Sequence, residues 1–194
     1  MIRTRVGYAG GKHRNPTYHD LGDHTETLQL DYDPDRISYA QLLEVFFAAH
    51  DPTAAPWSTQ YKAAVFAHDP GQQATARQSL LGVQERLGRP VRTQLLPYTG
   101  FTLAEDYHQK YSLRHREELM RALAAAYGEG AALNAALLRS TAAARLNGYA
   151  VGQGRSADLE RELASLGIGG QVGQRLLEQL RAREARGVGA AGCR

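Results

Sequence analysis

A sharp change in residue types near position 115 limits what this chain can fold into more than any other feature. Every histidine, lysine and phenylalanine and the only tryptophan lie at or before residue 115, whereas residues 116–194 consist mainly of Ala, Leu, Arg, Glu and Gly. Such a break is typical of a boundary between two structural units. The sequence therefore predicts one unit over residues 1–115 and a helical C-terminal extension with a flexible tail over residues 116–194.

Strand and helix patterns alternate over the first unit. Leu42, Val45, Phe46 and Ala49 recur at helical spacing after Ser38, which predicts a helix that buries this stripe. The expected elements are strands over 3–10 and 26–34, a helix over 39–50, a strand over 60–69, a helix over 71–88 and a strand over 91–99. This alternation predicts an α+β fold.

The predicted order is strand, strand, helix, strand, helix, strand. In two-layer α+β sandwiches an opening strand and helix usually precede such a set, and Met1 stands two residues before the first predicted strand. We therefore expect a two-layer sandwich that lacks its first strand and helix. The second unit is expected to be all-α, with helical segments over 116–130, 131–149, 157–167 and 170–187.

Charge and hydropathy narrow the range of partners. Residues 1–115 hold equal numbers of acidic and basic side chains, so the net charge of +3 lies in the second unit, where solvated helical faces account for it. This charge is too small to predict nucleic-acid binding. No apolar run is long enough for a membrane span, and residues 1–11 have no apolar signal core, so we expect a cytoplasmic protein. We also expect a monomer.

The stretch "GGKHRNPTYHDLGDHTET", residues 10–27, concentrates hydrogen-bonding side chains in a loop before a strand. Its histidines, His13, His19 and His24, share no helical or strand face, so they predict no metal site. Cys193 is the only cysteine, which excludes an internal disulfide and a metal site of several thiolates.

Several motifs in one order resemble a known family. "VGYAGG", "NPTY", "DHTE", "DYDPDRISYAQLLEVFFAAHDPT", "QYKAAVF" and "AEDYHQKY" follow one another as in methionine sulfoxide reductase A, the peptide-methionine (S)-S-oxide reductase. The resemblance runs from about Val6 to Tyr111. "STAAARLNGY" is similar to a subgroup of that family with a C-terminal helical extension. The resemblance implies a ferredoxin-like two-layer α/β sandwich that reduces methionine-S-sulfoxide in proteins, as a repair of oxidative damage.

The resemblance also implies roles for three residues. Glu26 would be the general acid, and Tyr18 and Tyr61 would donate hydroxyl hydrogens to the sulfoxide oxygen. A glutamate that gives up a proton at neutral pH needs partial burial. Gly10, Gly11 and Pro16 would bend the loop so that Tyr18 lies beside Glu26.

Neighbouring residues have less definite roles. His24 either orients Glu26 or has a structural role. We expect Trp57 to have a packing role. The common family pattern has an aspartate five residues before the tyrosine, where this chain has Pro56, and this departure weakens the transfer of the role to Tyr61.

The largest departure from the family concerns the nucleophile. The family's cysteine lies in a Gly-Cys-Phe-Trp motif that is absent here, and its expected position is upstream of Met1, as is that of the missing strand and helix. We interpret the chain as an N-terminally incomplete reductase, or else as a degenerate paralogue, and we expect it to be inactive as it stands. Cys193 is either a recycling thiol or a tail residue without function.

The resemblance implies no bound cofactor. It implies thioredoxin or another dithiol as reductant, and oxidised proteins or methionine-S-sulfoxide itself as substrate. Two alternatives stay open. One is a catalytically inactive sulfoxide-binding paralogue. The other is a nucleic-acid adaptor in which the glycine turn of "SLGIGGQVGQRLLEQL" holds a phosphate, although we favour a plain helix stop as the explanation of these glycines.

Overall fold

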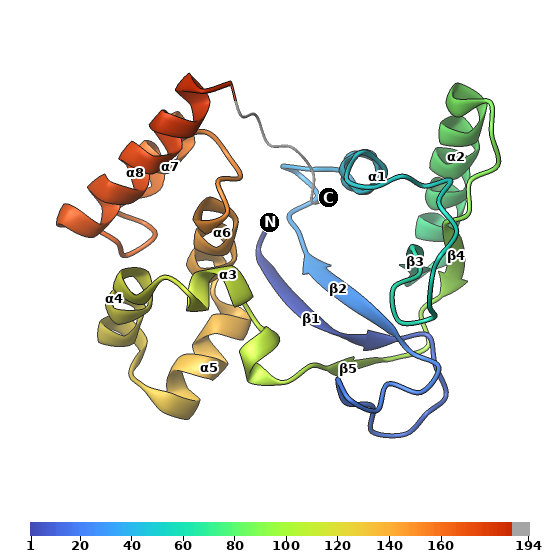
Figure 1. The fold of residues 1–194 in the computed structure, drawn as a ribbon, viewed down its shortest axis with the longest axis horizontal. Helices are drawn as coiled ribbons and strands as arrows, with labels where there is room; N and C mark the ends of the chain where they lie inside the picture. The colour runs from blue at the N-terminus through green and yellow to red at the C-terminus, as the bar shows by residue number, and fades with distance from the viewer. Residues whose placement is uncertain (188–194) are drawn as a thin grey trace. The chain divides into compact units, whose positions relative to one another are not determined.

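The structure, a computed structural model, describes residues 1–187 (Figure 1). It divides into two compact units. Among the described residues, one contains Val6–Gln29 and Asp33–Glu105, and the other contains Met1–Arg5, Leu30–Tyr32 and residues 106–187. The elements in chain order are β1 (Arg3–Ala9), β2 (Thr25–Asp31), α1 (Tyr39–Ala48), β3 (Ala64–Ala67), α2 (Pro70–Leu87), β4 (Gln94–Pro97), β5 (Phe101–Leu103), a 3-10 turn (Asp106–His108), α3 (Tyr111–Arg114), α4 (Glu117–Tyr127), α5 (Gly130–Arg139), α6 (Thr141–Ala150), α7 (Ser156–Glu162) and α8 (Gly170–Ala185).

The strands form two separate sheets. The first has the order β2-β1-β5, and β5 runs antiparallel to β1 with Tyr8 opposite Thr102. A Cβ atom at Gly7 would lie 2.2 Å from the Thr102 carbonyl oxygen, so glycine allows β5 to approach β1. Strand β5 was not expected from the sequence, because three residues carry too little alternation to reveal a strand.

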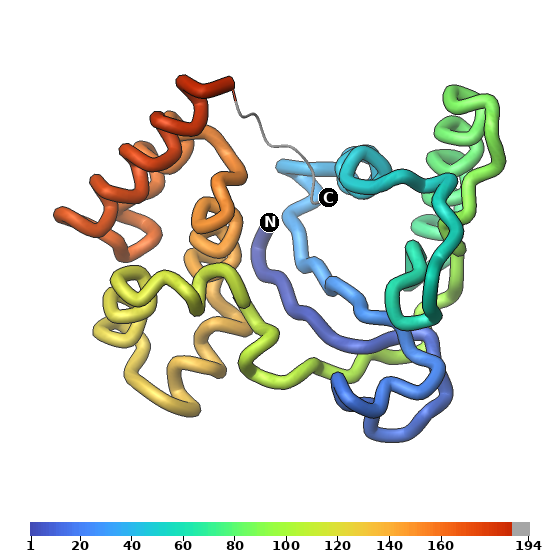
Figure 2. The backbone as a smooth tube through the Cα atoms, in the orientation of Figure 1, coloured from blue at the N-terminus to red at the C-terminus, as the bar shows by residue number. Residues whose placement is uncertain are grey.

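The second sheet is the parallel pair β3 and β4. Helix α2 connects the two strands, and the course of the chain through this helix can be followed in green in Figure 2. Both strands are shorter than the sequence predicts. In particular, Gln60 and Tyr61 lie in a turn before β3 and not in a strand over 60–69. The reason is that the backbone at Thr59 and Gln60 accepts hydrogen bonds from residues 25 and 26, so it is not available for the β3–β4 ladder.

The two helices of this unit begin where local capping signals place them. Ser38 accepts a hydrogen bond from the Gln41 backbone and forms a capping box before α1. Asp69 caps α2, and Gly88 in a left-handed conformation ends it. The expected buried stripe of α1 is wrong, because Leu43 and Phe47 are the buried residues and Val45 is 63% exposed.

The core beside α1 explains that difference. Helix α1 is apolar on most of its surface, so periodicity alone does not choose a face, and contacts with α2 and β3–β4 make the choice. The buried members of this core are Leu43, Phe47, Ala76 and Val83, against which Tyr39, Phe46, Val65, Leu80, Val91 and Leu95 pack.

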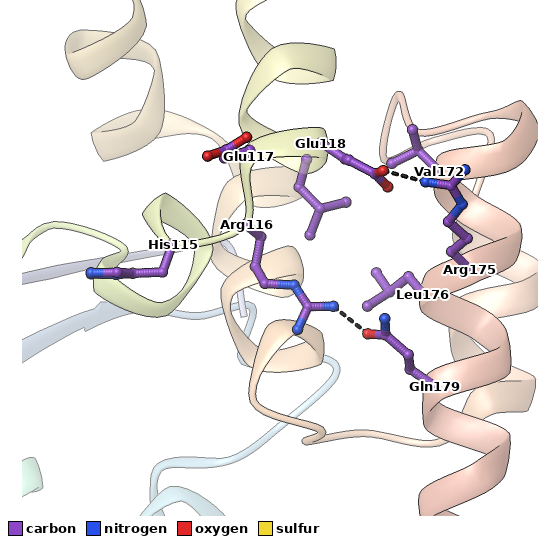
Figure 3. A pocket seen from close by; sticks show the side chains of 9 residues that line it. His115, Arg116, Glu117, Glu118, Val172, Arg175, Leu176 and Gln179 are labelled. Atoms are coloured by element: carbon purple, nitrogen blue, oxygen red, sulfur yellow. Dashed lines mark hydrogen bonds and ion pairs between the residues drawn. The ribbon is translucent and has the colours of Figure 1, made fainter.

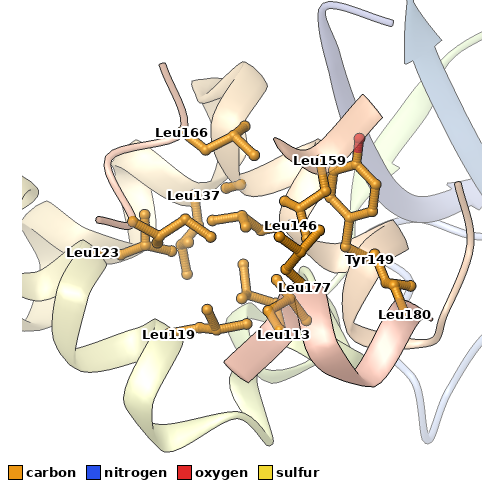
Figure 4. Close-up of a cluster of buried hydrophobic side chains, with 13 residues drawn as sticks. Leu113, Leu119, Leu123, Leu137, Leu146, Tyr149, Leu159, Leu166, Leu177 and Leu180 are labelled. Atoms are coloured by element: carbon orange, nitrogen blue, oxygen red, sulfur yellow. The ribbon is translucent and has the colours of Figure 1, made fainter. Parts of the chain in front are cut away.

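The helical unit has its own core, shown in Figure 4, in which leucines predominate. Leu113, Leu137, Leu146 and Leu159 are fully buried there. One helix was expected over 131–149, but Ser140 divides it into α5 and α6, since its extended backbone ends α5 and its hydroxyl caps α6. Helix α3 was not expected as a separate element.

The glycine-rich segment before α8 packs into this core. Leu166 and Ile168 are buried, and a Cβ atom at Gly173 would lie 2.5 Å from the Ile168 carbonyl oxygen. The absence of a side chain at Gly173 therefore lets the turn close against α8. Across residues 1–187, no helix combines the length and apolar character needed to cross a bilayer.

Candidate functional site

The loop that precedes β2 is held by two side chains at its end. Asp23 Oδ1 accepts hydrogen bonds from the backbone N–H groups of Lys12 and His13, at 2.7 and 3.0 Å. These bonds lower the pKa of the Asp23 carboxyl. His24, 8% exposed, accepts from the Gly11 N–H through Nδ1 at 3.3 Å and donates from Nε2 to the His13 carbonyl at 2.9 Å. These bonds give His24 a structural role in the loop, the second of the two roles expected for it.

Glycines allow the backbone of this loop to lie close to neighbouring side chains. A Cβ atom at Gly11 would lie 2.5 Å from the His24 ring, and one at Gly22, which has a φ of 58°, would lie 2.4 Å from His13 Cβ. Gly10, with a φ of 81°, faces Phe66 in the same way. The loop is therefore tightly folded, as the glycines in the sequence indicate.

Glu105 attaches Tyr18 to the core of the unit. Its Oε1 accepts from the Tyr18 backbone N–H at 3.1 Å, and its Oε2 accepts from the Tyr8 hydroxyl at 2.6 Å. Tyr8 is only 2% exposed and packs with Leu21. A carboxylate that accepts from two donors is a rigid support. Glu105 was not among the expected site residues, although it belongs to the quoted "AEDYHQKY" segment.

A second set of contacts joins the start of β2 to residues 59–61. The Glu26 N–H donates to the Gln60 carbonyl at 3.0 Å, and the Thr25 hydroxyl donates to the Thr59 carbonyl at 3.1 Å. The Gln60 side chain then donates from Nε2 to Glu26 Oε1 at 2.7 Å and to the Tyr61 hydroxyl oxygen at 3.1 Å. Gln60 was also missed, because glutamine carries no distinctive signal in a single sequence.

Tyr61 interacts with both of the other expected residues. The pKa of its phenol is raised, first because it hydrogen-bonds with Tyr18, then by desolvation, and then by the negative charge of Glu26. Tyr18, Glu26 and Tyr61 thus come together from three separate segments. Glu26 itself is exposed, in contrast to the partial burial that we expected.

Trp57 stacks on Tyr61, with ring centroids 4.6 Å apart and an angle of 23° between the planes. Its side chain nevertheless stays 80% exposed, so the expected packing role extends only to this one ring. Together the residues form an exposed cluster of hydrogen-bond donors beside an aromatic surface. Such a cluster can bind a polar oxygen attached to an apolar group.

Other candidate features lie apart from this cluster. Within residues 1–187, no three His, Cys, Asp or Glu side chains are grouped so as to hold a metal ion. Cys193 lies outside the described residues. A pocket of about 360 Å³ in the helical unit, between the start of α4 and α8, contains none of the expected site residues (Figure 3). There Arg116 bonds to Gln179, and Arg175 pairs with Glu118.

Comparison with known proteins agrees with the motifs around the cluster. Residues 1–134 match the family described as peptide methionine sulfoxide reductase. The enzyme MsrA of Acidobacterium capsulatum is 44% identical over 117 residues, which cover 55% of this chain and 75% of the relative. The peptide methionine sulfoxide reductase of Drosophila melanogaster is 37% identical over 171 residues, which cover 87% of this chain and 66% of the relative.

Solved structures agree with the fold. Mxr1 of Saccharomyces cerevisiae in reduced form gives a TM-score of 0.55 at 29% identity, over 59% of this chain and 71% of that chain. Methionine sulfoxide reductase A of Corynebacterium diphtheriae gives 0.54 at 30% identity, over 58% and 63%. The expected mixed α+β fold with a C-terminal helical region is confirmed. This chain belongs to the methionine sulfoxide reductase A family.

Proposed function

We propose that this chain binds methionine-S-sulfoxide of oxidised proteins, or the same oxidised amino acid on its own, through the sulfoxide oxygen, for thiol-dependent reduction. The observation that carries the proposal is the convergence of Tyr18, Glu26 and Tyr61 from three segments on one exposed cluster. Family membership supports the same reading.

The reaction requires hydrogen-bond donors at the oxygen. A thiolate attacks the sulfoxide sulfur and forms a sulfur–sulfur bond, while the oxygen gains negative charge and takes up a proton. The resulting hydroxyl then passes to the sulfur of the attacking thiol as the sulfur–oxygen and sulfur–sulfur bonds break, so that the thioether is released and the thiol becomes a sulfenic acid. A second thiol converts the sulfenic acid to a disulfide with loss of water, and a dithiol such as thioredoxin restores the thiols. Two electrons pass from the dithiol to the sulfoxide.

The described residues are suited to stabilising the oxygen. The Tyr61 phenol carries its hydrogen at neutral pH, as any tyrosine of ordinary or raised pKa does, and can donate it. Tyr18 is a second hydroxyl donor beside it. The role of Glu26 as proton source rests on the family resemblance, because its exposed carboxyl does not have the burial that this role needs. Fixed donors of this kind are often the largest contribution to stabilising a developing negative charge.

The nucleophile limits what this chain does alone. The sequence holds no Gly-Cys-Phe-Trp motif, and its only cysteine is Cys193. We therefore attribute oxygen recognition to residues 1–115 and no turnover to the chain as given. The same absence favours a second candidate, a paralogue that binds sulfoxide without reducing it. For either candidate we propose a cytoplasmic monomer.

Equilibrium binding tests the recognition step. The ligands are N-acetyl-methionine-(S)-sulfoxide methylamide and the corresponding thioether, measured by calorimetry. We expect the parent chain to prefer the sulfoxide. Tyr18→Phe and Tyr61→Phe should each weaken sulfoxide binding by about 5- to 10-fold, the value of one hydrogen bond, and leave thioether binding unchanged. Tyr98→Phe, in a ring that stacks on His68, is the matched control. Equal affinity of the parent for both ligands would contradict the proposal.

A further inference from the structure

Trp57 is the most exposed of the large apolar side chains that the structure identifies as exposed. It keeps 80% of its surface accessible, whereas Leu28, Val45 and the other members of that group expose at most 63%. Its ring is nonetheless ordered against Tyr61 by stacking at 4.6 Å. An aromatic ring that is held in place and also left open to solvent is a surface on which a ligand can pack.

The ring lies next to the donor that we assign to the sulfoxide oxygen. Tyr61 is shared by the stack with Trp57 and by the hydrogen-bond cluster of Gln60, Tyr18 and Glu26. In a sulfoxide, the oxygen and both carbon substituents are attached to one sulfur atom. An oxygen bound at the Tyr61 hydroxyl therefore brings those carbons to the neighbourhood of the Tyr61 and Trp57 rings.

We propose that Trp57 is a substrate-binding residue, whose ring packs against the sulfur and the methyl group of methionine sulfoxide while the Tyr61 hydroxyl holds the oxygen. This inference rests on the proposed function and adds the apolar half of the same site. The physical basis is the attraction between sulfur and an aromatic ring, together with the attraction of polarised C–H groups to the negative ring face. The group that packs on the ring is the methyl sulfoxide end of the oxidised methionine side chain.

The position of Trp57 on the loop before Tyr61 supports this assignment. Hydrogen bonds from Thr25 and Glu26 attach residues 59–61 to the start of β2. The Trp57 ring therefore stays close to the hydrogen-bond donors of the cluster. Because Trp57 is exposed, its replacement removes no core contact, and the stack on Tyr61 is the ring contact that is lost. A change in ligand affinity at this position therefore does not reflect unfolding of the core, and Trp57→Phe keeps a ring that can stack on Tyr61.

The experiment uses the full chain and the fact that Trp57 is its only tryptophan. Intrinsic fluorescence then reports on this ring alone. Titration with N-acetyl-methionine-(S)-sulfoxide methylamide should change the Trp57 emission and saturate at the dissociation constant found by calorimetry. Trp57→Ala should weaken sulfoxide binding by about 3- to 10-fold by calorimetry, and Trp57→Phe should restore most of the affinity. Leu81→Ala, which removes an exposed apolar side chain on α2, is the control and should have no effect.

The outcomes separate this inference from the proposed function. If the parent prefers sulfoxide to thioether and Tyr61→Phe weakens sulfoxide binding, but Trp57→Ala binds the sulfoxide as tightly as the parent, the inference is wrong and oxygen recognition stands. If the parent shows no preference for the sulfoxide, both are wrong. The inference is supported if the sulfoxide causes a saturating change in the Trp57 emission of the parent, and if Trp57→Ala lowers the affinity while Leu81→Ala does not.

Discussion

The side-chain amide of Gln60 donates a hydrogen bond to the Glu26 carboxylate at 2.7 Å, and the same nitrogen donates to the Tyr61 hydroxyl oxygen at 3.1 Å. Because Tyr61 accepts from Gln60, its own hydrogen points elsewhere, toward Tyr18, toward Glu26 or toward a bound oxygen. Because Glu26 Oε1 accepts from Gln60, a proton carried by Glu26 resides on Oε2. Gln60 therefore orients both groups.

Replacing Gln60 tests this orienting role. Gln60→Glu keeps the shape, but it removes the donor and places a second carboxylate beside Glu26. We expect sulfoxide affinity to fall by about 10-fold at pH 7 and to recover as the pH falls toward 4, where a protonated carboxyl can donate again. Gln60→Met should weaken binding without this recovery. Calorimetry at both pH values makes the measurement, and parallel pH profiles for the two variants would rule out the orienting role.

Cys193 gives a direct test of turnover. We expect the purified chain with a dithiol to reduce a methionine-S-sulfoxide peptide no faster than its Cys193→Ser variant, because the sequence has no Gly-Cys-Phe-Trp motif to supply the thiolate that attacks the substrate sulfur. The released thioether is measured by chromatography. Turnover that disappears in Cys193→Ser would make this cysteine the nucleophile and overturn the expectation.

Glu26 is tested in a chain that carries a nucleophile. When an N-terminal segment with the Gly-Cys-Phe-Trp motif of a relative is joined to this chain, we expect sulfoxide reduction. Glu26→Gln in that fusion should lower the rate near neutral pH by about 100-fold, since glutamine keeps the hydrogen bonds but has no proton to give. The loss should be smaller at low pH. A Glu26→Gln fusion as fast as its parent at pH 7 would exclude the acid role, and Glu44→Gln on the exposed side of α1 is the control.

Lys110 predicts a pH dependence of stability in the helical unit. Its side chain is buried and donates to the Thr4 carbonyl at 2.6 Å, and desolvation, with the charges of Arg5 and Arg114, lowers its pKa from 10.5 to about 8. Below pH 8 the cost of burying the charge is fully present. Between pH 8 and 10.5 the unfolded chain binds a proton that the folded chain has lost, so the free energy of unfolding rises with pH.

We expect this contribution to be about 2 kcal/mol after allowance for solvent screening. Lys110→Met removes the titrating group. Urea unfolding of the parent and the variant at pH 8 and pH 10.5 measures the difference, and subtraction cancels the groups that both chains share. An equal change with pH in the two proteins would show that Lys110 does not titrate in this range.

Local signals in the sequence determined much of the fold. The helix expected over 71–88 is α2, Pro70–Leu87, because the Asp69 cap and the Gly88 stop act within one turn of the chain. The same holds for Ser38 before α1. The motif order likewise indicated the family, since short peptide segments such as "NPTY" and "DHTE" can be read without knowledge of distant contacts.

Only the tertiary structure decided which residues support those motifs. Gln60 and Glu105 meet Glu26 and Tyr18 across 34 and 87 positions of sequence, and no local pattern reports a contact over that separation. The choice of the buried face of α1 and the exposure of Trp57 likewise depend on contacts between residues that are distant in the sequence. Capping and turn conformations depend on neighbours in the chain, whereas burial and side-chain hydrogen bonds depend on neighbours in space, which one sequence does not specify.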